Sequence, residues 1–139
     1  MARAEVDEGI GAWQGRAMMA AQTARRPDHV LLVEDSPIIA MNTEELLREL
    51  GVRDVRVAAS VAQAQALLDE ARFDMALLDL KLGDETSLPI ALRLAEDGVP
   101  IIFVTGFGEE IDLPESLCGT RVLKKPYNFN DLDEIIALP

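Results

Sequence analysis

The stretch that decides the fold is Met75-Ala76-Leu77-Leu78-Asp79-Leu80-Lys81-Leu82-Gly83. Four apolar residues lead directly into an aspartate, and the stretch ends at a glycine. This pattern predicts a strand that is buried on both faces and carries one carboxylate at its C-terminal end. In an open parallel sheet, ligands bind at the C-terminal ends of the strands. Because burying a lone charge is costly, we expect Asp79 to have a partner elsewhere in the chain.

The composition is that of one globular domain with an acidic surface. The chain has 139 residues, of which 49% are hydrophobic and 27% charged, and its formal net charge is −12. Such a charge argues against nucleic acid or an anionic membrane as the main partner. The single cysteine, Cys118, fits a reducing cytosol. No apolar stretch is long enough to span a bilayer, and Asp7 and Glu8 stand where a signal peptide is basic, so we expect a cytoplasmic protein.

The first 27 residues stand apart from the domain expected over residues 28–139. Several apolar residues in this N-terminal extension fall at roughly helical spacing, namely Ile10, Trp13, Ala17, Met18 and Ala21. Three nearby glycines weaken a helix prediction. The extension is therefore either a mobile tail, which an early start codon would also explain, or a short helix that docks on its own or a neighbouring domain.

Apolar strands alternate with amphipathic helices along the rest of the chain. The expected strands are 29–33, 52–57, 75–79, 100–105 and 121–124. Three of the expected helices begin at the caps Ser36, Ser60 and Asn130, and the third helix is expected over residues 87–96. The glycine-containing stretch between the last two strands predicts a short, displaced or mobile fourth helix. The pattern predicts an α/β fold, a doubly wound five-stranded parallel sheet of strand order 2-1-3-4-5.

This strand order places Glu34 and Asp35, which follow the first strand, beside Asp79. Carboxylates this close either raise each other's pKa or hold a cation, and Mg²⁺ prefers carboxylate oxygens. A carboxylate beside Mg²⁺ can also attack a phosphoryl group and form an aspartyl phosphate. That chemistry needs a cation and a hydroxyl donor from the protein. Thr105 and Lys125, which end the fourth strand and follow the fifth, would lie at the same edge of the sheet.

With these motifs on its strand ends, the chain resembles the receiver domain of bacterial two-component response regulators. The resemblance covers residues 29–138 and implies a flavodoxin-like fold. It implies that Asp79 is the phosphoacceptor, that Asp35 ligates Mg²⁺ directly together with Asp79, and that Glu34 acts through a bound water. The backbone carbonyl of Lys81 would be a further metal ligand. Two residues would bind the phosphoryl group and sense it, Thr105 and Lys125.

Two positions depart from the common pattern of that family. Val122 stands three residues before the lysine, where many receivers have an aromatic switch residue. The stretch 103–108 is similar to a subgroup of receivers with a Phe-x-Thr-Gly-aromatic sequence after the fourth strand. The resemblance to this subgroup implies that Gly106 and Phe107 belong to the moving segment. The alternative is that Phe107 merely packs under a loop.

The resemblance implies a signalling phosphoprotein rather than an enzyme. Such a protein catalyses only its own phosphorylation and dephosphorylation. Its partners would be a sensor histidine kinase or histidine phosphotransferase and an unknown downstream protein, and a homodimer stays open. Because the chain ends at the last helix, we expect a stand-alone receiver that signals by protein contact. The alternatives are a phosphate sink or shuttle without output, a phosphorylation-independent adaptor, and a phosphohydrolase. The phosphohydrolase is disfavoured because such enzymes usually carry a second acid two residues after the nucleophile, and here that residue is Lys81.

Overall fold

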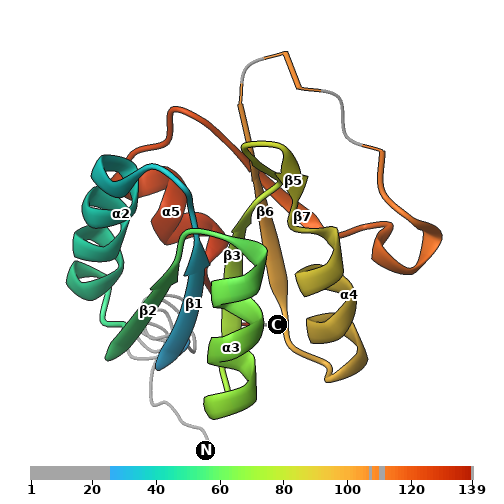
Figure 1. Ribbon diagram of the computed structural model, residues 1–139. Helices are drawn as coiled ribbons and strands as arrows, with labels where there is room; N and C mark the ends of the chain where they lie inside the picture. The colour runs from blue at the N-terminus through green and yellow to red at the C-terminus, as the bar shows by residue number, and fades with distance from the viewer. Residues whose placement is uncertain (1–25, 107, 110–111, 139) are drawn as a thin grey trace, which may run out of the picture.

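A five-stranded parallel sheet forms the centre of the computed structural model, which describes residues 26–106, 108–109 and 112–138 (Figure 1). The strand order is β2-β1-β3-β6-β7, which confirms the predicted order of the five main strands. Their bounds are β1 (His29–Val33), β2 (Asp54–Ala58), β3 (Met75–Asp79), β6 (Ile101–Thr105) and β7 (Arg121–Lys124). This order places the C-terminal ends of β1 and β6 on either side of that of β3.

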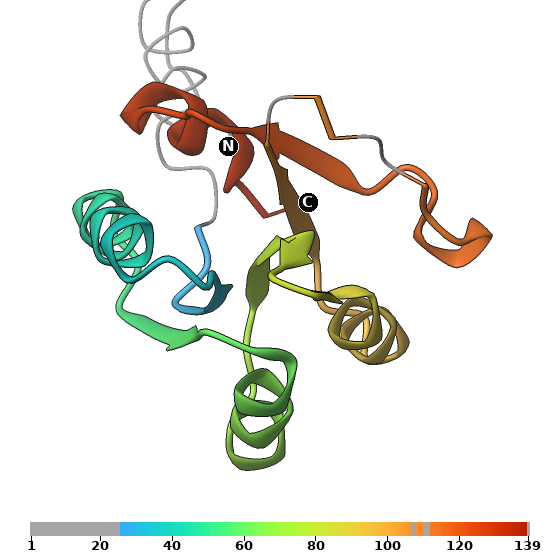
Figure 2. The same cartoon turned by 45° about the horizontal axis from the view of Figure 1, so that its top comes forward.

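Helices cover both faces of the sheet. In Figures 1 and 2, α2 and α5 lie on one face, and α3 and α4 lie on the other. The helices are α2 (Pro37–Glu49), α3 (Val61–Glu70), α4 (Leu88–Glu96) and α5 (Phe129–Ile135). This arrangement confirms the predicted doubly wound α/β fold. It also explains why the central strands are continuously apolar, because both of their faces are covered.

Two hydrophobic clusters hold the layers together, one on each face of the sheet. Leu78 and its alternate neighbours pack against α3 and α4, while Leu77 and its neighbours pack against α2 and α5. Every residue of β3 and β6 is buried. Burial of a large aliphatic or aromatic side chain stabilises the fold by about 1.5–3 kcal/mol, so these central strands form a rigid base for the residues at their ends.

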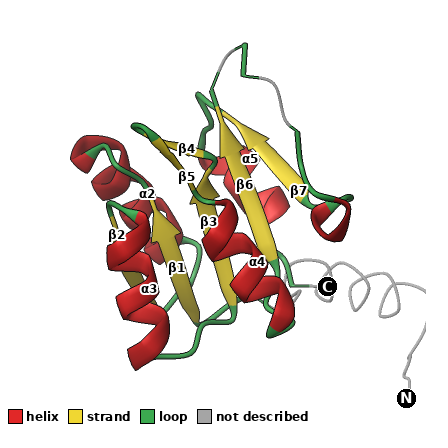
Figure 3. Ribbon diagram, turned by 45° about the vertical axis from the view of Figure 1, so that its right-hand side comes forward, coloured by secondary structure: helices red, strands yellow, loops and turns green. Residues whose placement is uncertain are grey.

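A small hairpin, which no sequence pattern indicated, follows β3. Strand β4 (Lys81–Leu82) pairs antiparallel with β5 (Glu85–Thr86), apart from the main sheet (Figure 3). Gly83 adopts a φ of 62° in the turn between them, a conformation that glycine adopts without steric penalty. The Ser87 N–H donates to the Leu80 carbonyl at 3.0 Å, which fixes the base of the hairpin at the residue directly after Asp79.

The connection between β6 and β7 is irregular, as predicted. Among its described residues, 106, 108–109 and 112–120, the only helical element is the 3₁₀ turn η1 (Glu115–Leu117). Leu117 anchors this turn because its side chain is 1% exposed and packs in the cluster against α4. Phe107, predicted to be part of the moving segment, lies outside the described residues, as do residues 1–25 of the predicted N-terminal extension.

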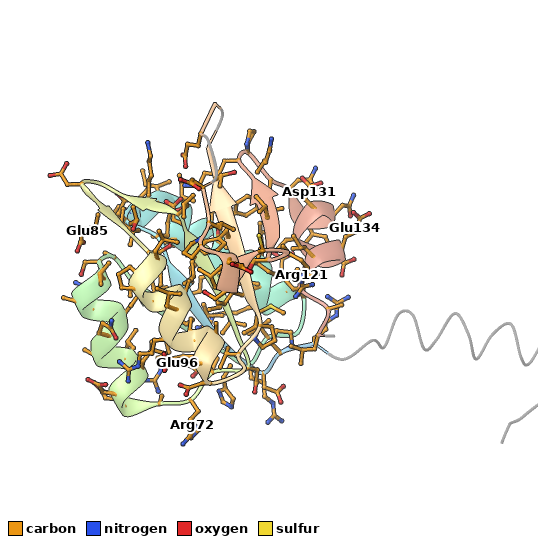
Figure 4. All side chains as sticks on the ribbon, turned by 90° about the vertical axis from the view of Figure 1, so that its right-hand side faces the viewer. Arg72, Glu85, Glu96, Arg121, Asp131 and Glu134 are labelled. Carbon is orange, nitrogen blue, oxygen red and sulfur yellow. The ribbon has the colours of Figure 1, made fainter. Side chains whose placement is uncertain are left out.

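The surface carries outward-pointing carboxylates on several elements. Glu85 on β5, Glu96 on α4, and Asp131 and Glu134 on α5 are exposed, and Figure 4 shows them around the molecule. This distribution fits the strongly acidic net charge of −12. Within the described part of the chain, no helix is long and apolar enough to cross a membrane.

The start of the last helix corrects one prediction. Asn130 was expected to be its cap, but the cap is Asn128, whose side chain accepts from the Asp131 N–H at 2.9 Å. The Asp131 carboxylate accepts from the Asn128 N–H at 3.0 Å and completes a capping box. The prediction failed because two asparagines stand two residues apart, and their sequence spacing alone does not say which one lies outside the helix.

We expect Asn128→Ala to lower the free energy of unfolding by about 1 kcal/mol, since it removes the side-chain acceptor of the cap. Asn130→Ala is the matched control, because Asn130 is exposed and already helical. Urea unfolding of both variants measures the difference. Equal destabilisation of the two variants would contradict the assignment of the cap.

Candidate functional site

The first acidic pair lies where β1 ends. The Glu34 N–H donates to the Ala58 carbonyl at 3.0 Å, which extends the pairing with β2 by one residue. The Glu34 side chain is buried, and one of its carboxylate oxygens accepts from the Ser36 N–H at 3.1 Å. Asp35 is exposed at the same edge of the sheet. The turn therefore directs one carboxylate inward and leaves the other accessible to solvent.

Asp79 ends β3 between the ends of β1 and β6. Its neighbour Leu78 pairs with Val33 of β1, and Asp79 itself pairs with Val104 of β6. Asp79 is only 5% exposed. One carboxylate oxygen of Asp79, one of Glu34 and one of Asp35 lie within 4.8 Å of one another. The structure thus brings together the three carboxylates that the sequence analysis expected to converge.

Lys125 supplies the positive charge of this acidic cluster. It follows β7, and its N–H donates to the Thr105 carbonyl at 2.8 Å, which continues the pairing of β6 with β7. The Lys125–Pro126 peptide bond is cis. The Lys125 Nζ lies 2.9 Å from Glu34 Oε1 and 3.1 Å from Asp79 Oδ2. One ammonium group therefore bridges two buried carboxylates.

The same surroundings shift the three ionisable groups differently. Burial raises the pKa of Asp79 to about 7 against the hydrogen bond from Lys125, and the charge of Glu34 adds to the rise. Burial also acts to raise the pKa of Glu34, but hydrogen bonds from Lys125 and the Ser36 N–H outweigh it and hold that pKa below its ordinary value. Hydrogen bonds to both carboxylates raise the pKa of Lys125, although burial opposes this. The lysine therefore stays charged, and the proton resides on Asp79 before Glu34.

Thr105 ends β6 beside this cluster. It is 1% exposed, and its hydroxyl has no hydrogen-bond partner among the described residues. A buried hydroxyl without a partner is unusual and calls for an explanation such as a ligand. Lys81 lies in the hairpin two residues after Asp79 with an exposed side chain, and Val122 is half-buried in β7.

Two contacts of the site were missed by the sequence analysis. The ion pair between Lys125 and Glu34 was not predicted, because Lys125 was expected to bind and sense a phosphoryl group and Glu34 to act through a bound water. The hydroxyl groups of Tyr127 and Thr43 lie 2.6 Å apart and join the segment after Lys125 to α2. Leu47, one helical turn after Thr43, is buried on the same face of α2, and this spacing was the only sequence signal for the contact.

The cluster fits a divalent cation by the chemistry of its donors. Its three carboxylates are hard oxygen ligands, and Mg²⁺ takes one or two of these and keeps several water molecules. Asp35 is exposed, so a hydrated ion can reach the cluster from solvent. The neighbouring lysine neutralises only part of the charge of three acids. The residues present therefore suit Mg²⁺ rather than zinc or copper, which favour nitrogen or sulfur ligands.

A doubly wound sheet with three acids, a lysine and a buried threonine at one edge defines a class of α/β domain with an acidic site at the C-terminal ends of its strands. The comparisons identify the family within that class. The family model described as the response regulator receiver domain matches residues 30–137. The chain belongs to this family of signalling proteins, in agreement with the resemblance seen in the sequence.

Individual relatives agree with this membership. The chain is 28% identical over 115 residues to the transcriptional regulatory protein PdtaR of Mycobacterium tuberculosis, with 81% of this chain and 56% of that protein covered. It spans about half the length of the curated relatives it matches. The solution structure of SdrG from Sphingomonas melonis Fr1 is 34% identical with a TM-score of 0.66, over 76% of this chain and 90% of that one.

A solved relative also holds a metal. The receiver domain of sensor histidine kinase PA1611 from Pseudomonas aeruginosa PAO1 has a magnesium ion coordinated in its active site cleft. It is 30% identical to this chain with a TM-score of 0.66, over 78% of this chain and 93% of that one. This finding agrees with the donor chemistry of the acidic cluster.

We expect the affinity for Mg²⁺ to rise with pH and then level off. Below about pH 7 the metal must displace the proton from Asp79, so affinity rises by up to about tenfold per pH unit, and above pH 7 little proton remains to displace. Calorimetric titration with Mg²⁺ between pH 5.5 and 8.5 measures this dependence. Asp84→Asn, an exposed acid in the hairpin turn, is the control that keeps the dependence. An affinity that does not change across this range would contradict the raised pKa.

Proposed function

We propose that this receiver domain accepts a phosphoryl group on Asp79 from a phosphohistidine of a sensor kinase or phosphotransferase. The observation that carries the proposal is the position of Asp79. Its carboxylate is buried at the C-terminal end of a central strand, 3.1 Å from a lysine and beside two further acids. Such a carboxylate has a cation to screen the incoming charge, and its acidic neighbours suit a metal.

The transfer forms one bond and breaks another. An oxygen of the Asp79 carboxylate attacks phosphorus, a P–O bond forms, and the P–N bond to the donor's imidazole breaks with the electron pair left on nitrogen. The attack requires the ionised carboxylate, and the contact with Lys125 favours that form. Burial opposes ionisation, so the lysine's position decides how much reactive carboxylate is present near neutral pH.

The metal ligands are part of the proposal. Asp35 and Asp79 would hold Mg²⁺ directly, with the backbone carbonyl of Lys81, and Glu34 would act through a water molecule. When bound, the ion neutralises charge on the phosphoryl oxygens. The hairpin of β4 and β5 supports the role of Lys81, because pairing with Thr86 fixes the backbone of that residue.

Phosphorylation would then redistribute contacts at the edge of the sheet. Once Asp79 carries a phosphoryl group, that group presents oxygens to the Lys125 ammonium and to the hydroxyl of Thr105. The hydroxyl is buried and has no partner among the described residues, so it is available to donate. A phosphoryl group shifts a conformational equilibrium only through such differential contacts. Val122 stands at the position of the aromatic switch residue, which it cannot replace. We therefore assign the conformational response to the segment that begins at Gly106 and includes Phe107.

A donor protein has an apolar surface to dock on beside the site. Ile38 is 80% exposed and Met41 is 64% exposed on α2. Ile38 also lines a pocket of about 370 Å³ with Lys125, Pro126 and Tyr127. Exposed large side chains next to the nucleophile favour this face of α2 as the contact with the phosphohistidine protein.

The proposal is tested by intact mass after incubation with acetyl phosphate. We expect wild type to gain one phosphoryl group only when Mg²⁺ is present, and Asp79→Asn to gain none while unfolding at a similar urea concentration. Asp84→Asn is the matched control and should be labelled like wild type. A wild type that gains no mass under any condition would overturn the proposal in favour of an adaptor, and a labelled Asp79→Asn would overturn the assignment of Asp79.

The docking surface gives a separate prediction. We use a phosphorylated kinase that labels wild type as the donor. We expect Ile38→Asp to slow transfer from this kinase at least about tenfold, because a charge buried at an apolar contact costs more than about 1.4 kcal/mol. Labelling by acetyl phosphate should stay as in wild type. Leu92→Asp, at an exposed apolar position on α4, is the control. Equal slowing with both donors would place the effect in the site itself and contradict docking through Ile38.

A further inference from the structure

The peptide unit that joins Thr105 to Gly106 offers a backbone donor at the site. The Thr105 carbonyl points toward β7, because it accepts from the Lys125 N–H at 2.8 Å. In a trans peptide the next N–H points the opposite way. Since β6 lies between β7 and β3, the Gly106 N–H is directed toward the β3 side. Asp79 ends β3 on that side, paired with Val104.

A side-chain carboxylate, that of Glu109, already accepts a hydrogen bond from the Gly106 N–H. The Gly106 N–H donates to Glu109 Oε2 at 2.8 Å, and the Glu109 N–H donates to the Gly106 carbonyl at 3.3 Å. The two hydrogen bonds close a short ring directly after Thr105. Bonds to a carboxylate are roughly twice as strong as those between neutral groups. Glu109 is half-buried, so solvent screens this bond less than it would on the open surface.

The glycine at position 106 makes room for the carboxylate. A Cβ atom at that position would lie 2.6 Å from Glu109 Oε2, well inside van der Waals contact. The backbone of Gly106 does not require glycine, since its φ is not among the positive values of this chain. The close approach of the Glu109 side chain is therefore the reason that the structure gives for a glycine there.

We propose that Glu109 is a built-in competitor of the phosphoryl group: its carboxylate holds the Gly106 N–H in the unphosphorylated protein and leaves it when Asp79 is phosphorylated. This inference rests on the proposed function. A phosphoryl group on Asp79 brings further negative oxygens to the edge that this N–H faces. Two anions at one donor repel each other, so Glu109 opposes phosphorylation, and its release frees the backbone after Thr105. Glu109 acts as a positioning residue, because among the described residues it forms no hydrogen bond or ion pair with Asp79 or Lys125.

The test compares rates of phosphorylation by acetyl phosphate with Mg²⁺. We expect Glu109→Gln to raise the rate about fivefold, because it removes the repelling charge while it keeps an acceptor for the Gly106 N–H. Glu109→Ala should raise the rate at least as much. Glu115→Gln is the matched control, since Glu115 is an exposed acid in the same connection between β6 and β7, and it should leave the rate unchanged.

A second variant tests the contact itself. Gly106→Ala introduces the Cβ atom that displaces the Glu109 side chain, so it should raise the rate as Glu109→Ala does. The double variant should then be no faster than either single variant, because both remove one interaction. If the two effects instead multiply, the contact between Gly106 and Glu109 does not mediate them, and the inference is overturned.

The Gly106 amide gives a readout that does not depend on phosphorylation. Its proton resonance should move upfield in Glu109→Ala, because the bond to the carboxylate is lost. On addition of beryllofluoride and Mg²⁺, the resonances of wild type and Glu109→Ala should become alike, because Glu109 has then left the N–H in wild type. If acetyl phosphate phosphorylates wild type, but its rate, and its Gly106 resonance before beryllofluoride is added, match those of the Glu109 variants, the role of Glu109 as a competitor is overturned. A wild type that acetyl phosphate cannot label would instead overturn the proposed function, and the competitor would fail with it.

Discussion

One ammonium group between two buried carboxylates is the interaction on which the site depends. Glu34 and Asp79 are 4% and 5% exposed, and two unpaired charges at that depth would be costly. The Lys125 Nζ offsets this cost by contacting both, at 2.9 and 3.1 Å. Because three carboxylates share one lysine, the cluster keeps an excess of negative charge that a divalent cation can neutralise. Burial, to which the charge of Glu34 adds, raises the pKa of Asp79 to about 7, so a cation that displaces this proton also increases the amount of ionised carboxylate.

The parallel sheet makes this arrangement possible. Strands β1, β3 and β6 are buried almost throughout, and their register aligns the points at which each becomes polar. The sequence predicted these points because an acid or a hydroxyl follows each apolar run. The strand order then followed from right-handed crossovers between parallel strands. The meeting of Asp79 with Glu34, Asp35 and Lys125 was therefore predictable, because strand ends bring residues together independently of side-chain detail.

Contacts that depend on a short turn or on one rotamer were not predictable. The choice between Asn128 and Asn130 as a cap depends on one turn of backbone. The hairpin after Asp79 has two strands of only two residues each, which is too short for a periodic pattern. The Glu109 carboxylate reaches the Gly106 N–H because the chain turns back on itself there, and no sequence pattern indicated this contact. Such local features decide how the site is regulated, while the sheet decides where it lies.

The measurement that tests the account most directly is the location of the phosphoryl group. Borohydride reduces an acyl phosphate on an aspartate to homoserine, so protein phosphorylated with acetyl phosphate and Mg²⁺ can be reduced, digested and sequenced by mass spectrometry. The account predicts homoserine at position 79 and at none of the neighbouring acids. Homoserine at position 35, or the longer alcohol 2-amino-5-hydroxypentanoic acid that a reduced glutamyl phosphate gives at position 34, with Asp79 unmodified, would contradict the assignment of Asp79 as the nucleophile.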